Sequence, residues 1–247
     1  ITPEVIDLET TKVVPTINFK YDANATTKSA SALEALITTA VTNYSSTTLE
    51  KFETVFRYSK FTTLIDEVDP AILNNITNIK ISKTFKPTLA SALKYTISFS
   101  NALFNPHSGH LASTSGVTAG GILSSTGFSL SGSSETWYLE DDGAGIVKAY
   151  YVSGTSKVYQ AASVGTIDYT TGDVVLTKIN ITAVGDVDGA TSTSVKITVQ
   201  PASNDVVPVR NQILQIDSVN LSVTGTADTI AAGAGDAGVN YTTSATY

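Results

Sequence analysis

The sequence predicts an α+β protein that is mainly β, with an N-terminal helical segment followed by antiparallel sheets in a sandwich-like arrangement. Two patterns predict this class. In residues 26–69, apolar residues recur every three to four positions, which is the period of a helix. From about residue 71, apolar residues alternate with polar ones, which is the period of a strand, and turn signals separate the runs.

The chain of 247 residues divides into four predicted parts. They are an extended lead-in (1–25), a helical segment (26–70), an antiparallel β-rich domain (71–226) and a flexible tail of Gly, Ala and Thr (227–247). Pro3 and Pro15 interrupt the lead-in, in which residues 17–21 are a candidate short edge strand. Pro70 ends the helical segment, because the residue before a proline is pushed out of the α region.

Three apolar stripes define the predicted helices. The first has helical spacing over about three turns and consists of Leu33, Leu36, Ile37, Ala40, Val41 and Tyr44. Ser31 and Glu34 have the spacing of a capping box at its start, although this spacing also allows both to lie inside the helix. The second stripe puts Leu49, Phe52 and Phe56 on one face of a second helix, and the third consists of Phe61, Leu64, Ile65 and Val68.

The first two stripes offer more apolar area than one neighbouring sheet face needs to cover. They are therefore a candidate assembly interface, which consists of Leu33, Leu36, Ile37, Val41, Tyr44, Leu49, Phe52 and Phe56. The alternative is that three closely spaced helices bury these side chains among themselves. The sequence favours neither interpretation.

The stretch "GTIDYTTGDVVL", residues 165–176, decides how the acidic residues of the β region are interpreted. Two β-prone runs flank Thr171 and Gly172, and Asp168 and Asp173 lie beside this turn. Catalysis or metal binding needs a partner base or further ligands, and none is close in sequence. We therefore predict a β-hairpin in which Gly172 supplies a positive φ and the aspartates cap the turn.

Composition excludes several function classes. The net charge is −7, and a nucleic-acid site needs clustered Lys and Arg, so no nucleic-acid partner is predicted. No run of 18 apolar residues and no signal-like leader are found, so no membrane association is predicted. The absence of Cys excludes disulfides, thiolate metal sites and Cys nucleophiles. The chain opens on Ile1 rather than Met, which predicts a processed chain or part of a longer one.

The remaining motifs predict no catalytic, cofactor-binding or metal-ligating residue. His107 and His110 are the only histidines, and no Asp or Glu lies near them in the sequence. The stretches "GDVDGA" (185–190) and "EDDG" (140–143) have the composition of tight turns. Gly233, Gly235 and Gly238 have the spacing of a dinucleotide-binding motif but lack the strand and helix that such a site needs. Asp66, Glu67 and Asp69 are typical of a helix end.

Several segments together resemble one family. They are "SALEALITTAVTNY", "LEKFETVFRYSKFTTLIDEVDPAILNNITNIKI", "YLEDDGAGIVKAYYV", "VGTIDYTTGDVVL" and "PASNDVVPVRNQILQID". Over residues 26–223 the chain is similar to the C-terminal part of the large baseplate wedge subunit of contractile-tailed bacteriophages of the T-even type, which is related to the baseplate-J proteins. The Gly-rich end of the chain is not part of this resemblance.

The resemblance implies a structural virion protein of the tail baseplate that is not an enzyme and needs no cofactor. In that family two copies of the subunit join another wedge protein, and wedges close into a ring around the tail hub. It therefore implies homo-oligomerisation within a hetero-oligomeric ring, contacts with other wedge proteins and assembly in the cytoplasm of a host bacterium. Further domains precede this region in the family.

Two other functions are compatible with the composition. One is a carbohydrate-binding or adhesin-type β-domain of a secreted or surface protein, for which the eleven Tyr residues provide aromatic side chains. Such a domain needs an exposed aromatic platform, and Trp137 and Tyr138 are its best candidates. The other is a hydrolase on a β scaffold, which the absence of a G-x-S-x-G motif disfavours.

Overall fold

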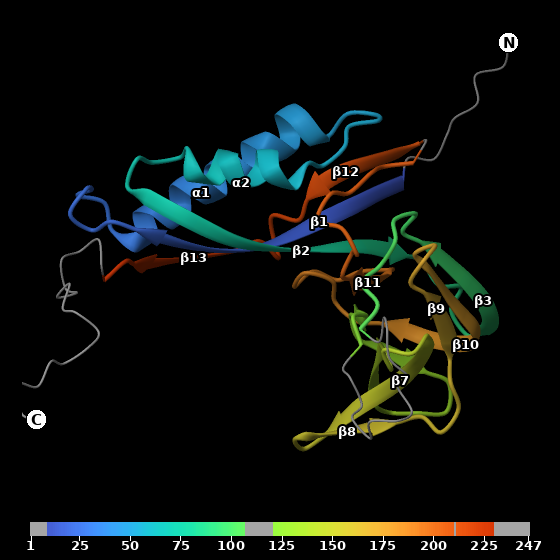
Figure 1. Ribbon diagram of the computed structural model, residues 1–247. Helices are drawn as coiled ribbons and strands as arrows, with labels where there is room; N and C mark the ends of the chain where they lie inside the picture. The colour runs from blue at the N-terminus through green and yellow to red at the C-terminus, as the bar shows by residue number, and fades with distance from the viewer. Residues whose placement is uncertain (1–8, 107–120, 210, 230–247) are drawn as a thin grey trace, which may run out of the picture.

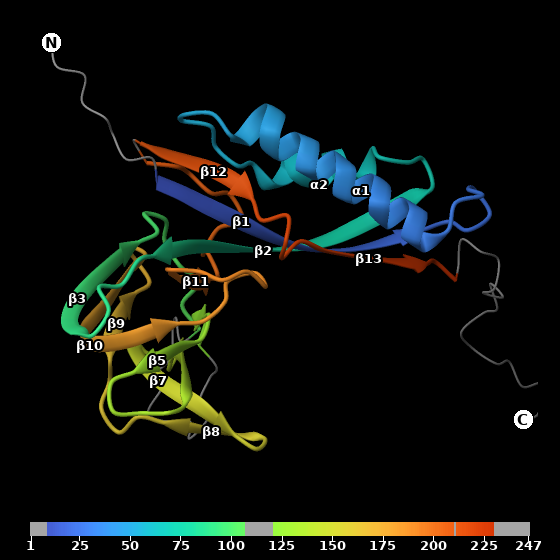
Figure 2. The same cartoon turned by 180° about the vertical axis from the view of Figure 1, so that it is seen from behind.

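The structure is a computed structural model that describes residues 9–106, 121–209 and 211–229 (Figures 1 and 2). Two sheets make up this part of the chain. Helices lie along one face of the first sheet, and the second sheet lies beyond the end where β2 and β11 meet (Figure 1). The predicted class, mainly β with an N-terminal helical segment, is confirmed. The four-part division of the chain stays a prediction.

The first sheet has the strand order β12-β1-β2-β11-β4 among the described residues, and β13 also pairs with β1. Its strands are β1 (Glu9–Tyr21), β2 (Ile72–Phe85), β4 (Ser124–Ser125), β11 (Val195–Val199), β12 (Gln212–Ile216) and β13 (Ser222–Ala227). Strand β1 pairs antiparallel with β2 on one side. On its other side it pairs in parallel, first with β12 and then with β13, so the sheet is mixed.

The expectation of a short edge strand at 17–21 is wrong. Strand β1 begins at Glu9, has 13 residues and lies between β2 on one side and β12 and β13 on the other. Pro15 is tolerated because β12 ends and β13 begins close to this point, so few ladder partners face its missing N–H. The alternation of Val13, Ile17 and Phe19 with exposed residues turns their side chains towards the helices.

The helical part consists of α1 (Ala30–Tyr44), a π-helical turn η1 (Ser45–Leu49) and α2 (Tyr58–Asp66). Leu33, Ile37 and Val41 form the buried stripe of α1, as its spacing predicts. The N-cap is Ser29, whose hydroxyl accepts from the N–H of Ala32, and not Ser31. Glu34 instead reaches β13, where its Oε1 accepts from the N–H of Gly225 at 2.8 Å.

The predicted second helix is not formed, because its C-terminal end pairs with the segment between β11 and β12. None of the residues 50–57 is helical, and Glu53 has a positive φ of 61°. Phe56 exchanges backbone hydrogen bonds with Val206 at 2.9 and 3.1 Å, which holds it in extended backbone. Leu49, Phe52 and Phe56 therefore share no helical face: Leu49 and Phe56 are buried, whereas Phe52 is 64% exposed.

The second sheet has the order β3-β10-β5-β6-β7-β8, and β9 pairs with both β10 and β7. Its strands are β3 (Ser91–Ser98), β5 (Phe128–Leu130), β6 (Thr136–Asp141), β7 (Ile146–Ser153), β8 (Ser156–Tyr159), β9 (Gly165–Asp168) and β10 (Asp173–Val184). Because β9 links β7 back to β10, the strands from β10 to β7 close into a small barrel, and β3 and β8 extend from it.

The buried apolar residues form one cluster that runs from the helices through the first sheet into the barrel. Phe61 of α2 lies at its helical end, with ring centroids 5.1 Å from Phe56 and 5.8 Å from Tyr44. Leu139, Val147 and Leu176 line the barrel interior. Among the described helices, none is both long enough and apolar enough to cross a membrane.

Candidate functional site

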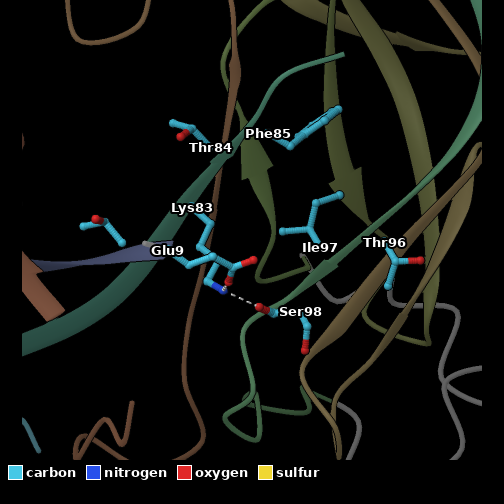
Figure 3. Close-up of a pocket in the computed structure, with 8 residues that line it drawn as sticks. Glu9, Lys83, Thr84, Phe85, Thr96, Ile97 and Ser98 are labelled. Atoms are coloured by element: carbon cyan, nitrogen blue, oxygen red, sulfur yellow. Dashed lines mark hydrogen bonds and ion pairs between the residues drawn. The ribbon is translucent and has the colours of Figure 1, made fainter. Parts of the chain in front are cut away.

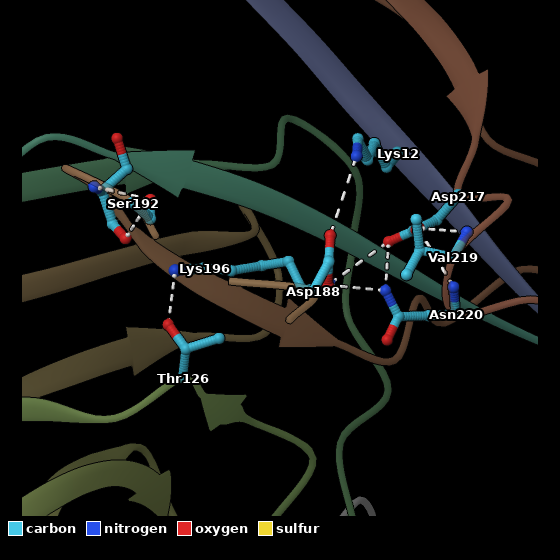
Figure 4. Close-up of polar contacts among 9 residues, drawn as sticks. Lys12, Thr126, Asp188, Ser192, Lys196, Asp217, Val219 and Asn220 are labelled. Carbon is cyan, nitrogen blue, oxygen red and sulfur yellow. Dashed lines mark hydrogen bonds and ion pairs between the residues drawn. The ribbon is translucent and has the colours of Figure 1, made fainter. Parts of the chain in front are cut away.

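A cluster of charged and amide side chains lies where the first sheet meets the turn between β10 and β11 (Figure 4). We call Lys12, Asp188, Lys196, Asp217 and Asn220 the junction cluster. The ammonium of Lys196 binds Asp188 and lies 3.3 Å from Oδ2 of Asp217. The amide Nδ2 of Asn220 donates to both carboxylates, at 2.7 and 2.9 Å. These contacts, with the ion pair of Lys12 and Asp188, connect β1 to three segments near the C-terminal end of the described chain.

Asp217 is the buried anchor of the junction cluster, with no exposed area. Its Oδ1 accepts from the backbone N–H groups of Val219 and Asn220, both at 3.2 Å. Its own N–H donates to the carbonyl of Val13 in β1 at 2.8 Å. The carboxylate therefore holds the turn between β12 and β13 while its charge is paired with Lys196.

The electrostatics of the junction cluster are those of a structural ion pair. Burial of Asp188 favours its neutral form, but hydrogen bonds from Lys196 and Asn220 outweigh burial and hold the pKa of Asp188 below its ordinary value. A general base or nucleophile needs a reacting group within reach, whereas Oδ1 of Asp188 already accepts from both Lys196 and Asn220. Among the described residues, no group of three or more His, Cys, Asp or Glu could hold a metal ion.

A second buried lysine connects the two sheets beside a pocket of about 350 Å³ (Figure 3). Nζ of Lys83 donates to Glu9 at 2.9 Å and to the carbonyl of Ser98, at the end of β3, at 2.6 Å. The hydrogen bond from Lys83 lowers the pKa of Glu9. Because the Glu9 side chain is mostly exposed, water screens this pair, so we assign it a positional role.

The predicted hairpin at 165–176 is confirmed. Strands β9 and β10 pair antiparallel from Asp168↔Asp173 to Gly165↔Leu176. Oδ1 of Asp168 accepts from the N–H groups of Thr170 and Thr171, which lowers the pKa of this carboxyl. Asp168 therefore caps the turn as predicted, whereas Asp173 lies opposite it as the first residue of β10. The Tyr169 hydroxyl donates to Oδ2 of Asp141 at 2.5 Å, and burial, followed by this bond, raises the pKa of Tyr169.

Gly172 is required for two separate reasons, which a matched pair of variants separates. Its φ is +80°, and a Cβ built there would lie 2.2 Å from the carbonyl oxygen of Asn101. Gly132 has the same φ, but none of the described atoms would lie within 4 Å of its Cβ. We expect Gly132→Ala to cost about 1 kcal/mol and Gly172→Ala about 2–4 kcal/mol, measured by urea denaturation. Equal losses would show that the contact with Asn101 relaxes freely.

The other acidic motifs are turns and caps, as predicted. Val187 and Ala190 bridge across the turn in "GDVDGA", with positive φ at Asp188 and Gly189. In "EDDG", the buried Asp141 accepts from the N–H of Leu123 at 2.8 Å. At the end of the helical part, Asp69 binds Nζ of Lys28 at 2.7 Å. The remaining motifs lie outside the described residues: His107, His110, Gly233, Gly235 and Gly238.

Sequence reasoning missed the junction cluster and the pair of Lys83 and Glu9. The stretch "SVKITVQ" gave no usable signal, because alternation places Lys196 on the face opposite Val195, Ile197 and Val199, where a lysine normally faces water. Lys196 lies in β11, four of whose five residues are buried, including Lys196 itself. Its partners lie 8 and 21 residues away and could not be named from the pattern.

The structure places the eight candidate interface residues in three classes. Leu33, Ile37, Val41, Leu49 and Phe56 are fully buried within the chain. Tyr44 is half-buried against this core, whereas Leu36 and Phe52 are exposed. The structure of a single chain does not test whether another chain binds here, so the interface stays a prediction.

Trp137 and Tyr138 do not form one aromatic platform. They are neighbours in β6, so their side chains point to opposite faces of the sheet. The Trp137 ring packs 5.0 Å from Tyr151. The Tyr138 ring stacks 5.6 Å from Tyr150, in a cross-strand row that continues to Tyr159. The ammonium of Lys157 lies 4.4 Å over the Tyr150 ring, so the row is partly covered by the chain's own side chain.

The chain was compared with known proteins. Residues 11–84 match the family model described as baseplate structural protein gp6, C-terminal domain III. This segment is similar to a baseplate domain. The segment, hereafter the baseplate-like segment, contains most of β1 and β2 and all the described helices, which is less than a third of the chain. The match supports a structural role in a phage baseplate. A comparison with curated proteins found no match.

Proposed function

We propose that this chain is a structural component of the baseplate wedge of a contractile phage tail, related to the T-even and baseplate-J proteins. It acts by binding copies of itself and other baseplate proteins, within a ring assembled in the host cytoplasm, and it catalyses no reaction. The match of the baseplate-like segment carries this proposal. The junction cluster supports it, because its charged groups are paired with one another rather than directed at a substrate.

The exposed apolar side chains of the baseplate-like segment are the proposed contact points. Among its described residues, four large apolar side chains are exposed, and they are Leu36, Phe52, Leu73 and Ile76. Ile76 is 67% exposed and alternates with Thr77, which is buried, so it points away from the helices. The interface therefore rests on Leu36 and Phe52 among the eight predicted residues. The five buried ones support the surface from within.

Self-association is expected at micromolar concentration in sedimentation velocity, because exposed apolar side chains of this size favour a partner. The double variant Leu36→Asp, Phe52→Asp should weaken association by about tenfold or more, since a charge would be buried without a partner. Ile37 is unsuitable for this test because it is fully buried, and a charge there would unfold the chain.

The matched control is Thr39→Asp with Thr48→Asp. Both threonines are exposed and belong to the same helical part, so the added charge is the same. This control should associate like the parent. A parent that stays monomeric at high concentration would contradict self-association through this surface. Equal weakening by both double variants would assign the effect to charge alone.

A further inference from the structure

Strand β3 forms an open edge of the second sheet, on the outer side of that sheet (Figures 1 and 2). It pairs with β10 on one side, and within the described part of the chain no strand pairs with its other side. We propose that this edge accepts an extended, acidic segment of another polypeptide, which adds a strand to the second sheet. This surface is separate from Leu36 and Phe52, and the proposal does not depend on the baseplate role.

Hydrogen bonds show which backbone groups of β3 face outwards. The N–H of Phe99, just after the strand, donates to the carbonyl of Gly172 beside β10. The carbonyl of Ser98 instead accepts from Lys83, on the opposite side. Because successive residues of a strand alternate in direction, the N–H and C=O groups of three further residues also face outwards, and these are Ala92, Lys94 and Thr96. Among the described residues, these outward groups have no hydrogen-bond partner.

The other edges of the two sheets are covered or short. At β12 the N–H of Ile216 donates to Ser45 of the π-helical turn, and at β13 the N–H of Gly225 donates to Glu34 of α1. Strands β4 and β8 have only two and four residues. Covering and shortening are common ways to keep an edge from pairing with another chain. With eight residues and open backbone groups, β3 is the exception among the described edges.

The charges around β3 favour an acidic partner. The whole chain has a net charge of −7, yet residues 70–134 contain no Asp or Glu and four lysines, which are Lys80, Lys83, Lys86 and Lys94. Lys94 lies in the middle of β3, and Lys178 lies in the irregular part of β10 opposite it. Both are exposed, and within the described part of the chain neither forms an ion pair. Carboxylates on an added strand would pair with these free ammonium groups.

Lys94 also disfavours a second copy of this chain as the partner. Antiparallel pairing of β3 with itself would bring two Lys94 side chains close together, and like charges on neighbouring strands are destabilising. A lysine on an edge strand is a recognised device against such self-pairing. The edge is therefore open to a strand of opposite charge and protected against its own copy.

The pocket of about 350 Å³ gives the added strand room at one end of this edge. Its walls include Thr96, Ile97 and Ser98 of β3 and the end of β2 (Figure 3). Lys83 reaches across from β2 and already satisfies the Ser98 carbonyl, so the open edge ends there. The ladder is thus limited to Ala92–Thr96. For an isolated peptide, a ladder this short predicts a dissociation constant of about 0.1–1 mM.

The test is a fluorescence-anisotropy titration with a labelled seven-residue peptide in which Thr and Glu alternate. A peptide with Lys in place of Glu should bind at least about tenfold more weakly, because it removes the charge complementarity. A peptide with Pro in place of Thr keeps the charge but lacks every second N–H, so it should also bind at least about tenfold more weakly. Hydrogen exchange followed by NMR should show protection of the Lys94 and Thr96 amides by the Thr-Glu peptide.

Variants of the chain make the test specific. Thr96→Pro removes an outward N–H but no hydrogen bond to β10, so it should abolish binding and leave the circular dichroism spectrum unchanged. Thr96→Val keeps the N–H and should bind like the parent. Lys94→Glu should weaken binding by about tenfold or more. Its matched control is Lys60→Glu, an equal change of charge at an exposed position of α2, which should change the affinity by less than about twofold.

Four results would overturn the proposal. The first is the absence of saturable binding of the Thr-Glu peptide to the parent chain. The second and third are equal binding of the Pro-Glu peptide and equal weakening by Lys94→Glu and Lys60→Glu, since both would assign the attraction to charge alone. The fourth is protection of amides outside β3 without protection of Lys94 and Thr96, which would place the peptide elsewhere. If Thr96→Pro does not fold, Lys94→Glu and its control decide the question.

Discussion

Replacing Lys196 with alanine is expected to lower the free energy of unfolding by about 3–5 kcal/mol. The side chain is 9% exposed and binds Asp188 and Asp217. Its removal leaves two carboxylates close together, both on the amide of Asn220, without a buried cation between them. Urea denaturation followed by circular dichroism measures the change.

Lys12→Ala is the matched control, because Lys12 pairs with the same aspartate but is 36% exposed and 3.9 Å away. Its loss should cost no more than about 1 kcal/mol. A Lys196→Ala protein that is within about 1 kcal/mol of its parent would contradict the structural role of the junction cluster.

The lowered pKa of Asp188 gives the junction cluster a signature in acid. A carboxyl whose pKa is lower in the folded state contributes stability that is present above its ordinary pKa of about 4. This contribution is lost as the pH falls through the folded-state pKa. The stability of Asp188→Asn should therefore fall less steeply than that of the parent below about pH 4. Parallel curves would assign the acid sensitivity to other carboxyls.

Replacing Phe61 with alanine is expected to destabilise the chain by about 3–5 kcal/mol. The ring is fully buried and contacts the rings of Phe56 and Tyr44, so alanine leaves a cavity that the sheet and α1 cannot fill. Phe52→Ala is the control, because the same ring at position 52 is 64% exposed. It should change stability by no more than about 0.5 kcal/mol in the same denaturation experiment.

Equal losses of stability for Phe61→Ala and Phe52→Ala would contradict the assignment of Phe61 as buried and Phe52 as exposed. That result would favour the second helix that the spacing of Leu49, Phe52 and Phe56 predicts, in which Phe52 is buried. A small loss for Phe61→Ala alone would instead show that the helical part is loosely attached to the first sheet.

Local pattern predicted the parts of the fold that local forces decide. The stripe of Leu33, Ile37 and Val41 fixes the buried face of α1, and Thr171-Gly172 fixes the hairpin of β9 and β10. Both depend on residues within a few positions of one another. The predicted fold class was therefore correct, and so was the turn interpretation of the acidic motifs.

Long-range pairing could not be predicted from the sequence. Strand β1 pairs in parallel with β12 and β13, about 200 residues later, and alternation carries no information about which strand is the neighbour. The second predicted helix is not formed for a related reason. Phe56 exchanges backbone hydrogen bonds with Val206, and this distant partner outweighs the helical spacing of Leu49, Phe52 and Phe56.

The candidate site was missed because its residues are individually unremarkable in sequence. Lys12, Asp188, Lys196 and Asp217 come from β1, a turn, β11 and the loop after β12. Only the mixed first sheet brings them together. The interface prediction was made from the spacing of apolar residues, which does not distinguish the buried Ile37 from the exposed Leu36 beside it.

The central claim is that this chain is a structural component of a phage tail baseplate. Immunogold electron microscopy of purified particles, with an antibody raised against the folded chain, tests it most directly. The account predicts gold at the baseplate end of the tail in intact particles, and none after the antibody is absorbed with the purified chain. Particles that carry no label, or that are labelled only on the head or along the tail tube, would contradict it.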